Sequence, residues 1–199
     1  MKKNFFRSFC AVAAVLIGFV CFADAQPDPA KFPTIKIDNF GQIDQRYYRG
    51  AQPEPSDYQS LKELGVNTVV DLRNDPTDYE KKNVEALGMK YVNIPMSGWR
   101  TPDMDDINQF LALFNDPETV VFAHCKAGRH RASVAAAAYR YTKYGWDYDQ
   151  VYKEMKDYKY SNGLVHGALG SFVKKWGEKL ESQRAAVPAV AAAEIGAQN

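Results

Sequence analysis

The segment Thr119-Val-Val-Phe-Ala-His-Cys-Lys-Ala-Gly-Arg-His-Arg131 joins a short apolar run to a compact polar turn. The run at 119–124 predicts a buried β-strand because it is short and rich in β-branched and aromatic side chains. A helix is expected from residue 131, so the polar residues form a strand-to-helix turn. Because ligands of open α/β sheets bind beyond the carboxyl ends of the strands, this turn marks the expected active site.

Strand and helix patterns alternate on both sides of this segment. Further strands are expected at 47–50, 67–73 and 90–95, and helices at 55–64, 77–87, 103–114, 131–143, 147–158 and 164–182. Strand, helix and strand in repeated order predict right-handed crossovers between parallel strands. The sequence therefore predicts a single α/β domain over 34–182, with a mostly parallel central sheet flanked by helices.

The composition is that of an ordinary globular chain. Its 199 residues, 46% hydrophobic and 25% charged, are enough to bury one sizeable core. These proportions exclude a disordered, collagen-like or multi-span membrane protein as a description of the whole chain. The formal net charge of +1 argues against a dedicated nucleic-acid binder, which needs a large excess of Lys and Arg. No nucleic-acid partner is expected.

The first 25 residues have the pattern of a signal peptide. Three basic residues precede an apolar run at 9–22, and small residues at Ala23 and Ala25 predict cleavage before Gln26. An uncleaved membrane anchor is the alternative, but the apolar run is short for a membrane span. We expect an exported protein, periplasmic or secreted, with no stable membrane span after cleavage.

Two segments flank the predicted domain. Residues 26–33 are polar and Pro-rich, which predicts an exposed lead-in. Residues 183–199 are Ala-rich and interrupted by Pro188, and we expect this tail to be disordered. A weak final helix is the alternative for the tail.

The turn at 124–131 contains residue types that suit nucleophilic attack on a phosphate. Cleavage of the signal peptide leaves Cys125 as the one cysteine, so no internal disulfide can form. A turn around Gly128 can point successive backbone N–H groups at an anion, and the following helix N-terminus adds positive potential. Arg131 supplies a two-pronged donor for phosphate oxygens. Such surroundings favour the thiolate form of cysteine, so Cys125 is the predicted nucleophile.

Cys125, five residues and then Arg131, preceded by His124, resemble the signature loop of the protein-tyrosine-phosphatase superfamily, in its dual-specificity branch. The loop is most similar to that of the plant and fungal atypical dual-specificity phosphatases, which act on inositol pyrophosphates. Its basic residues also resemble those of cysteine phytases. With Tyr48-Arg-Gly-Ala-Gln-Pro53 and Val69-Val-Asp-Leu-Arg73, the similarity covers most of 45–180. The resemblance implies the cysteine-phosphatase fold and a mechanism without metal or other cofactor.

The resemblance also implies a role for each loop residue. Cys125 forms a phosphocysteine, and Arg131 holds the phosphoryl oxygens. His124 braces the loop and tunes the thiol. The substrate-binding candidates are Lys126, Ala127, Gly128, Arg129 and His130, although the charged members also fit a solvated surface turn. Ala132 stands where the family usually has Ser or Thr, so Ser133 is the supporting candidate for the second step.

Asp103 is the candidate proton donor. It lies 22 residues before Cys125, where the atypical branch also shows an Asp before a helix. An Asp at a helix start is equally expected as an N-cap, and Asp105 and Asp106 compete for the donor role. Asn93 falls near the acid position of other dual-specificity enzymes and cannot donate as an acid.

These observations predict an exported, metal-independent cysteine phosphatase. Its expected partner is a phosphorylated small molecule, an inositol polyphosphate or pyrophosphate. A protein tyrosine or dual-specificity phosphatase acting on a phosphoprotein is the alternative. From other classes, a rhodanese-like sulfurtransferase and a non-catalytic phosphate-binding module remain open. No metal site is expected, because no ligand pair has zinc spacing. His166 has no motif around it and is expected to be structural or exposed.

Overall fold

The computed structural model describes residues 29–163 and 165–196, and the predicted signal peptide lies outside them. Within the described residues, five strands form one sheet in the order β1-β2-β5-β3-β4. The strands are β1 (Gly41–Asp44), β2 (Tyr47–Gly50), β3 (Thr68–Arg73), β4 (Lys90–Met96) and β5 (Val121–His124). The α-helices are α1 (Asp57–Glu63), α2 (Glu80–Ala86), α3 (Met104–Ala112), α4 (Arg131–Tyr139), α5 (Tyr148–Asp157) and α6 (Gly167–Gly196).

The sheet is mostly parallel, which confirms the predicted fold class. Strands β2 and β5, β5 and β3, and β3 and β4 pair in parallel, whereas β1 pairs antiparallel with β2 at one edge. Sequence analysis missed β1 because its residues, Gly-Gln-Ile-Asp, include a single apolar side chain. The tight turn between β1 and β2, where the Arg46 amide donates to Asp44 Oδ1 at 2.8 Å, brings this short strand into the sheet.

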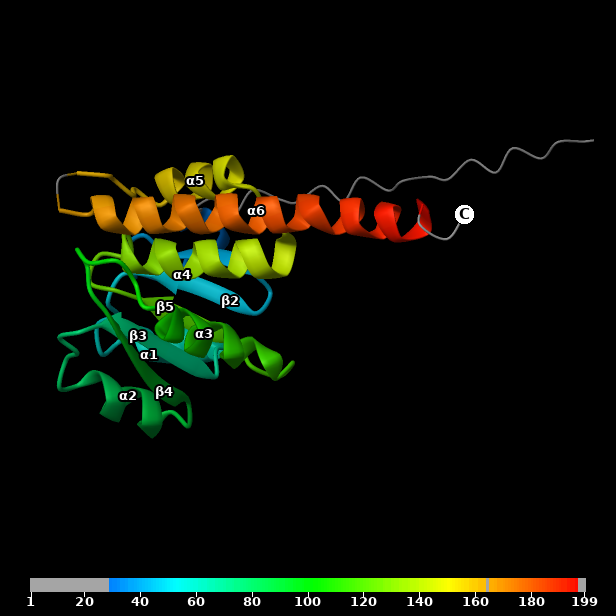
Figure 1. Ribbon diagram of the computed structural model, residues 1–199. Coiled ribbons are helices and arrows are strands. Elements are labelled where there is room, and N and C mark those ends of the chain that lie inside the picture. Colours follow the sequence, from blue (N-terminus) through cyan, green and yellow to red (C-terminus); the bar gives the residue numbers. More distant parts are fainter. Residues whose placement is uncertain (1–28, 164, 197–199) are drawn as a thin grey trace, which may run out of the picture.

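Alternation along the strands divides the core between the two faces of the sheet, because successive side chains point to opposite faces. On β3, Val70 and Leu72 pack in a core with residues of α3 and α4, while Val69 packs with residues of α1 and α2. Figure 1 shows α4, α5 and α6 packed together on one side of the sheet. The same alternation continues through β5, so His124 and Cys125 face opposite sides.

The boundaries of several elements differ from the sequence expectation. The helix predicted at 131–143 is α4 followed by a π-helical turn at Arg140–Tyr144, which ends at Gly145 with a φ of 65°. At the N-terminal side, packing begins inside the predicted lead-in. The Phe32 ring lies 5.3 Å from the Phe40 ring in an edge-to-face contact.

Helix α6 continues beyond the predicted domain end at 182. It extends to Gly196, so residues 183–196 have helical backbone where a disordered tail was expected. Alanine has the highest intrinsic helix propensity, which favours continuing the helix once its first turns are packed. Leu169 and Val173 bury those first turns, whereas side chains at 182–186 are exposed. Poor order of the tail in solution stays a prediction. Within the described residues, no helix combines the length and apolarity needed to cross a membrane.

Candidate active site

The loop Cys125–His130 connects β5 to α4 at the carboxyl edge of the parallel strands. Strand β5 lies between β2 and β3, although it follows both in the chain. The helices that precede and follow β3 in the chain, α1 and α2, pack on one face of the sheet, and α3, which leads into β5, packs on the other. Such a reversal of strand order opens a crevice at the strand ends, and the loop occupies it.

A cavity of about 430 Å³ lies at this loop. Its lining includes five of the predicted site residues, Cys125, Lys126, Ala127, His130 and Arg131. It also includes five residues that the sequence analysis did not assign to the site, Asn74, Asp75, Gly98, Trp99 and His166. The β3–α2, β4–α3 and α5–α6 connections therefore all contribute to the site.

Gly128 and Arg129 do not line the cavity, and Gly128 has a packing role. Its φ is 64°, in the left-handed region that L side chains rarely adopt. A Cβ atom there would lie 2.5 Å from the Gly50 carbonyl carbon and 2.7 Å from the Ala51 amide nitrogen. The loop can approach the end of β2 this closely because Gly128 has no side chain.

The carbonyl groups of the loop face protein donors. The Lys126 carbonyl accepts from the Gln52 amide, the Gly128 carbonyl from Arg49 Nη2 and Asn39 Nδ2, and the Arg129 carbonyl from Ser133 Oγ. In a trans peptide, the N–H points opposite to the preceding carbonyl. The N–H groups that follow these carbonyls therefore point away from those donors, an arrangement that fits the predicted anion cradle.

Arg49 on β2 is the main buried support of the loop. Its side chain is fully buried, and its guanidinium donates to the Gly128 carbonyl at 2.6 Å and to Ser133 Oγ at 2.9 Å. The guanidinium also stacks 4.0 Å from the centre of the Tyr158 ring. Arg49 belongs to the motif Tyr48–Pro53, from which no role for it was predicted. An arginine in an otherwise buried strand was the available signal, since buried arginines are nearly always paired.

Ser133 supports the loop through buried hydrogen bonds. Its hydroxyl is buried, accepts from Arg49 and donates to the Arg129 carbonyl at 2.5 Å. It does not line the cavity. The structure thus gives Ser133 a bracing contact, and its participation in a second chemical step stays a prediction. Ala132, which replaces the family's hydroxyl residue, is also buried.

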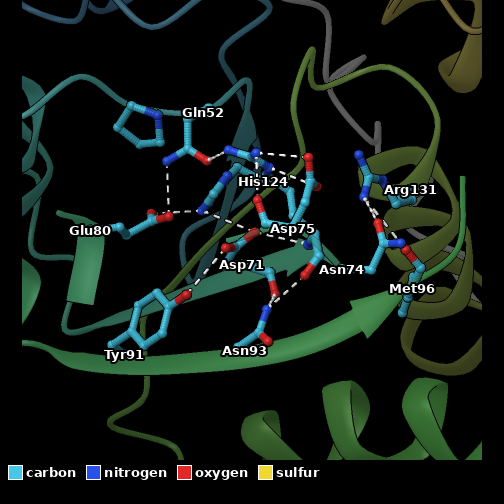
Figure 2. Close-up of polar contacts among 12 residues, drawn as sticks. Gln52, Asp71, Asn74, Asp75, Glu80, Tyr91, Asn93, Met96, His124 and Arg131 are labelled. Atoms are coloured by element: carbon cyan, nitrogen blue, oxygen red, sulfur yellow. Dashed lines mark hydrogen bonds and ion pairs between the residues drawn. The ribbon is translucent and has the colours of Figure 1, made fainter. Parts of the chain in front are cut away.

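His124 lies on the other face of β5, in a buried charged cluster. Its Nε2 is 2.8 Å from Glu80 Oε1 and 4.0 Å from Asp71 Oδ1, and all three side chains are fully buried. Gln52 Nε2 donates to Glu80 Oε2 at 2.9 Å, as Figure 2 shows. Tyr91 donates to Asp71 Oδ2 at 3.1 Å. His124 therefore ties the start of the loop to α2, which agrees with its predicted bracing role.

The two carboxyl groups of this cluster respond differently to burial. Burial raises the pKa of Asp71, and the nearby charge of His124 only partly opposes this effect. Burial also favours a higher pKa for Glu80, but the hydrogen bond and charge of His124, with hydrogen bonds from Gln52 and Tyr58, lower the pKa below its ordinary value. Glu80 is therefore the ionised partner of His124.

The same three residues approach metal-ligand spacing. Ligand atoms of Asp71, Glu80 and His124 all lie within 4.8 Å of one another. Each of these side chains already contacts another member of the cluster, and the carboxylates also accept from Gln52 and Tyr91. The contacts describe a buried ion pair, and the absence of a metal ion stays a prediction.

Arg131 and Asp75 stand on the cavity wall. Arg131 Nη1 donates to Asn74 Oδ1 at 3.2 Å, which holds the guanidinium against the β3–α2 connection (Figure 2). Asp75 forms an ion pair with Arg73 Nη2 at 3.1 Å. The hydrogen bond from Arg73, with the charges of Arg73 and Arg131, lowers the pKa of Asp75. Asp75 is therefore an ionised carboxylate at neutral pH.

Asp103 caps α3, as one of its two predicted roles requires. Its carboxylate accepts from the Asp105 amide at 3.0 Å, and its backbone is extended, as at an ordinary N-cap. Asp103 is exposed, and Asp103, Asp105 and Asp106 are all absent from the cavity lining. The proton-donor role of Asp103 stays a prediction. Asn93 Nδ2 donates to the Asp71 and Arg73 carbonyls, which makes Asn93 a structural residue.

A pair of histidines closes one side of the cavity. The rings of His130 and His166 stack with centroids 3.6 Å apart and an interplanar angle of 21°. His166 Nδ1 lies 2.6 Å from the Gly98 carbonyl oxygen. Burial, with the positive charges of His166, Arg129 and Arg131, lowers the pKa of His130 to about 4. His130 is therefore uncharged near neutral pH. His166 was expected to be structural or exposed, and its position in the cavity lining was not predicted.

Residues 33–173 match the model of a family described as a DSP-PTPase phosphatase fused to NAD+ kinase. The match covers most of the chain. The chain belongs to this phosphatase family. Its membership confirms the resemblance inferred from the Cys125–Arg131 loop, and the cavity at that loop is the expected place for the activity of such a phosphatase.

The chain also resembles two curated proteins over part of its length. The phosphatase is 34% identical over 94 residues to a beta-lactamase hydrolase-like protein of Agrobacterium fabrum, covering 44% of this chain and 22% of the relative. It is 25% identical over 135 residues to the inositol diphosphatase DSP3 of Arabidopsis thaliana, covering 63% of each. The chain thus spans less than two thirds of the length of these two relatives.

The fold is shared with the core catalytic domain of the PP-IP phosphatase SIW14 from S. cerevisiae. The TM-score is 0.63 at 20% sequence identity, over 78% of this chain and 94% of that domain. At this identity the likeness shows the fold alone, and it confirms the predicted cysteine-phosphatase fold.

Substituting Gly128→Ala tests the close approach of the loop to β2. We expect a loss of about 1–3 kcal/mol in the free energy of unfolding, because the variant combines left-handed backbone with a backbone clash. Phosphate-releasing activity should fall at least tenfold. Urea denaturation and phosphate release measure the two effects. Gly163→Ala is the matched control, since nothing lies within 4 Å of its Cβ position. Equal stability of the two variants would contradict the packing role.

Substituting Glu80→Gln tests the buried ion pair. At pH 7 we expect a loss of about 2 kcal/mol in the free energy of unfolding, because a charged hydrogen bond is removed. The pKa of Glu80 is lowered by folding, so its stabilisation is complete above the unfolded value of about 4.3 and disappears as pH falls through the folded value.

The difference between wild type and Glu80→Gln should therefore shrink between pH 7 and pH 3, as urea denaturation at each pH will show. Glu85→Gln on the same helix is the control, because Glu85 is about half exposed and pairs with Lys81 at 3.9 Å. Its effect should stay within about 0.5 kcal/mol. A pH-independent difference for Glu80→Gln would contradict the ion-pair interpretation.

Proposed function

We propose that this protein hydrolyses phosphate esters through a phosphocysteine formed on Cys125, without a metal ion. The observation that carries the proposal is the cavity in which Cys125 and Arg131 meet at the end of β5. The carbonyl groups of the loop accept from protein donors, which leaves the following N–H groups to form an anion cradle around the cysteine. Family membership supports the same reaction class.

In the first step, the Cys125 sulfur attacks phosphorus and the leaving oxygen departs. Arg131 and the loop N–H groups stabilise the negative charge on the phosphoryl oxygens as the loose transition state forms. In the second step, water attacks the phosphocysteine and releases phosphate. The contact between Arg131 and Asn74 positions the guanidinium before substrate binds, which reduces the ordering required in the transition state.

The proposed substrate is an inositol polyphosphate or pyrophosphate. Lys126 and Arg129 are exposed on the loop, where they can bind phosphates other than the one under attack. The cavity of about 430 Å³ is within the size range of small-molecule sites. The named activities of the Arabidopsis and yeast proteins support the same choice.

A second candidate substrate is a phosphotyrosine side chain in a protein. Trp99 lines the cavity and is 59% exposed, so its ring is available to stack on a phenyl group. Both substrates would react with the same cysteine, so a comparison of kcat/KM between them distinguishes the two candidates.

Phosphate release from inositol phosphates, phosphotyrosine peptides and nucleotides tests the proposal. We expect the highest kcat/KM on an inositol polyphosphate or pyrophosphate. Cys125→Ser should lose at least 10³-fold on every substrate while still binding phosphate, because a hydroxyl is a much weaker nucleophile than a thiolate. Chelation with EDTA should change nothing.

Residual activity of Cys125→Ser within tenfold of wild type would refute the mechanism. Sulfur transfer from thiosulfate to cyanide would instead indicate the sulfurtransferase class. Phosphate binding without turnover would indicate a binding module, an outcome for which Ala132 provides a reason. A higher kcat/KM on phosphotyrosine peptides would favour the second candidate substrate.

We also propose that the phosphatase is exported after cleavage before Gln26. The basic and apolar pattern of residues 1–25 supports this proposal. The expected result is a mature protein whose N-terminal sequence begins Gln-Pro-Asp-Pro, checked by N-terminal sequencing of protein recovered from the envelope or medium of the producing cells. An intact N-terminus in the cytosolic fraction would contradict export.

A further inference from the structure

We propose that His166 is the proton donor of the first step and the proton acceptor of the second. The inference rests on the proposed phosphatase function and adds a catalytic residue from outside the Cys125–Arg131 loop. His166 lines the same cavity as Cys125 and Arg131, although it lies just before α6, more than thirty residues after that loop.

Two contacts orient the His166 ring. A carbonyl oxygen can only accept a hydrogen bond, so the 2.6 Å contact with the Gly98 carbonyl means that Nδ1 carries hydrogen. One face of the ring stacks on His130. With Nδ1 bonded, Nε2 is the nitrogen that gains or loses a proton. This fixed tautomer is the arrangement that proton transfer at a single ring nitrogen requires.

The other titratable groups on the cavity wall suit other roles. Asp75 is held ionised by Arg73, and His130 is uncharged near neutral pH. Lys126 and Arg131 are cations suited to binding phosphate oxygens. Cys125 is the nucleophile. Histidine is the side chain that exchanges protons in this pH range, which leaves His166 as the donor among the described residues of the wall.

The candidate donor identified from sequence is placed differently. The Asp103 carboxylate is bonded to the Asp105 amide at the exposed start of α3, and it does not line the cavity. His166 faces the cavity directly. His166 therefore shares the cavity with a leaving group bound at Cys125, whereas Asp103 does not line it.

The two steps balance as follows. As the sulfur–phosphorus bond forms, the bond from phosphorus to the leaving oxygen breaks, and its electron pair stays on that oxygen. The oxygen takes the proton from His166 Nε2. In the second step, a water oxygen bonds to phosphorus while His166 Nε2 takes a proton from that water. The sulfur–phosphorus electron pair returns to Cys125, and the enzyme regains its starting protonation state.

A matched pair of variants separates proton transfer from structure. In His166→Asn, the side-chain amide can still donate to the Gly98 carbonyl, but no group remains that titrates near neutral pH. His166→Ala removes both properties. The substrates are 4-nitrophenyl phosphate and phenyl phosphate, which have similar shapes. Phenolate, with a conjugate-acid pKa close to tyrosine's value of about 10, depends far more on a proton donor than 4-nitrophenolate does.

We expect His166→Asn to lose less than about fivefold in kcat on 4-nitrophenyl phosphate and about 10²–10³-fold on phenyl phosphate. The basic limb of the pH–rate profile for phenyl phosphate should flatten. Added imidazole should restore part of the phenyl phosphate activity of His166→Ala. Thermal unfolding of both variants shows whether they are folded, and His166→Asn provides the decisive data if His166→Ala is not.

Three outcomes would overturn the inference while leaving the phosphatase function intact. One is an equal loss on both substrates in folded His166→Asn, which would indicate a structural role. Another is no loss on either substrate. The third is a loss confined to phenyl phosphate in Asp103→Asn but not in His166→Asn, which would make Asp103 the donor. Activity of Cys125→Ser equal to wild type would instead refute the phosphocysteine mechanism itself.

Discussion

The close contact between the Cys125–His130 loop and the end of β2 is the constraint on which the site depends. Gly128 approaches the Gly50 carbonyl carbon to a distance that excludes a side chain, and Arg49 donates to the Gly128 carbonyl from below. A buried guanidinium is costly unless its charge and donors find partners. Here the Gly128 carbonyl and the Ser133 hydroxyl accept from Nη2, and the guanidinium stacks on the Tyr158 ring. The loop and its support thus stabilise each other.

At the end of strand β5, His124 and Cys125 are joined by one peptide bond but lie in different electrostatic environments. His124 points into a fully buried cluster with Glu80 and Asp71, in which it pairs with Glu80. Cys125 lies on the opposite side, at the cavity with Lys126 and Arg131. This division follows from the two-residue period of a strand. It places the buried charged cluster on one face and the proposed anion site on the other, so the two sites use different charged side chains.

Three connections converge on the cavity and differ in their contribution. The β3–α2 connection brings Asn74, which orients Arg131, and the β4–α3 connection brings the Gly98 carbonyl, which orients His166. The α5–α6 connection brings His166 itself. Phosphoryl transfer depends mainly on positioning and electrostatic stabilisation, so under the proposed mechanism these contacts would hold the side chains ready before substrate arrives.

The sequence by itself determined the α/β class, the mostly parallel sheet and the loop from Cys125 to Arg131. These features depend on local periodicity and on residues adjacent in the chain, which a single sequence displays directly. It could not separate the two roles of Asp103, and it missed β1, the support by Arg49 and the place of His166. The support by Arg49 and the place of His166 depend on contacts between segments 68 to 84 residues apart. Only the folded backbone brings such segments together, because no local pattern encodes which distant surfaces meet.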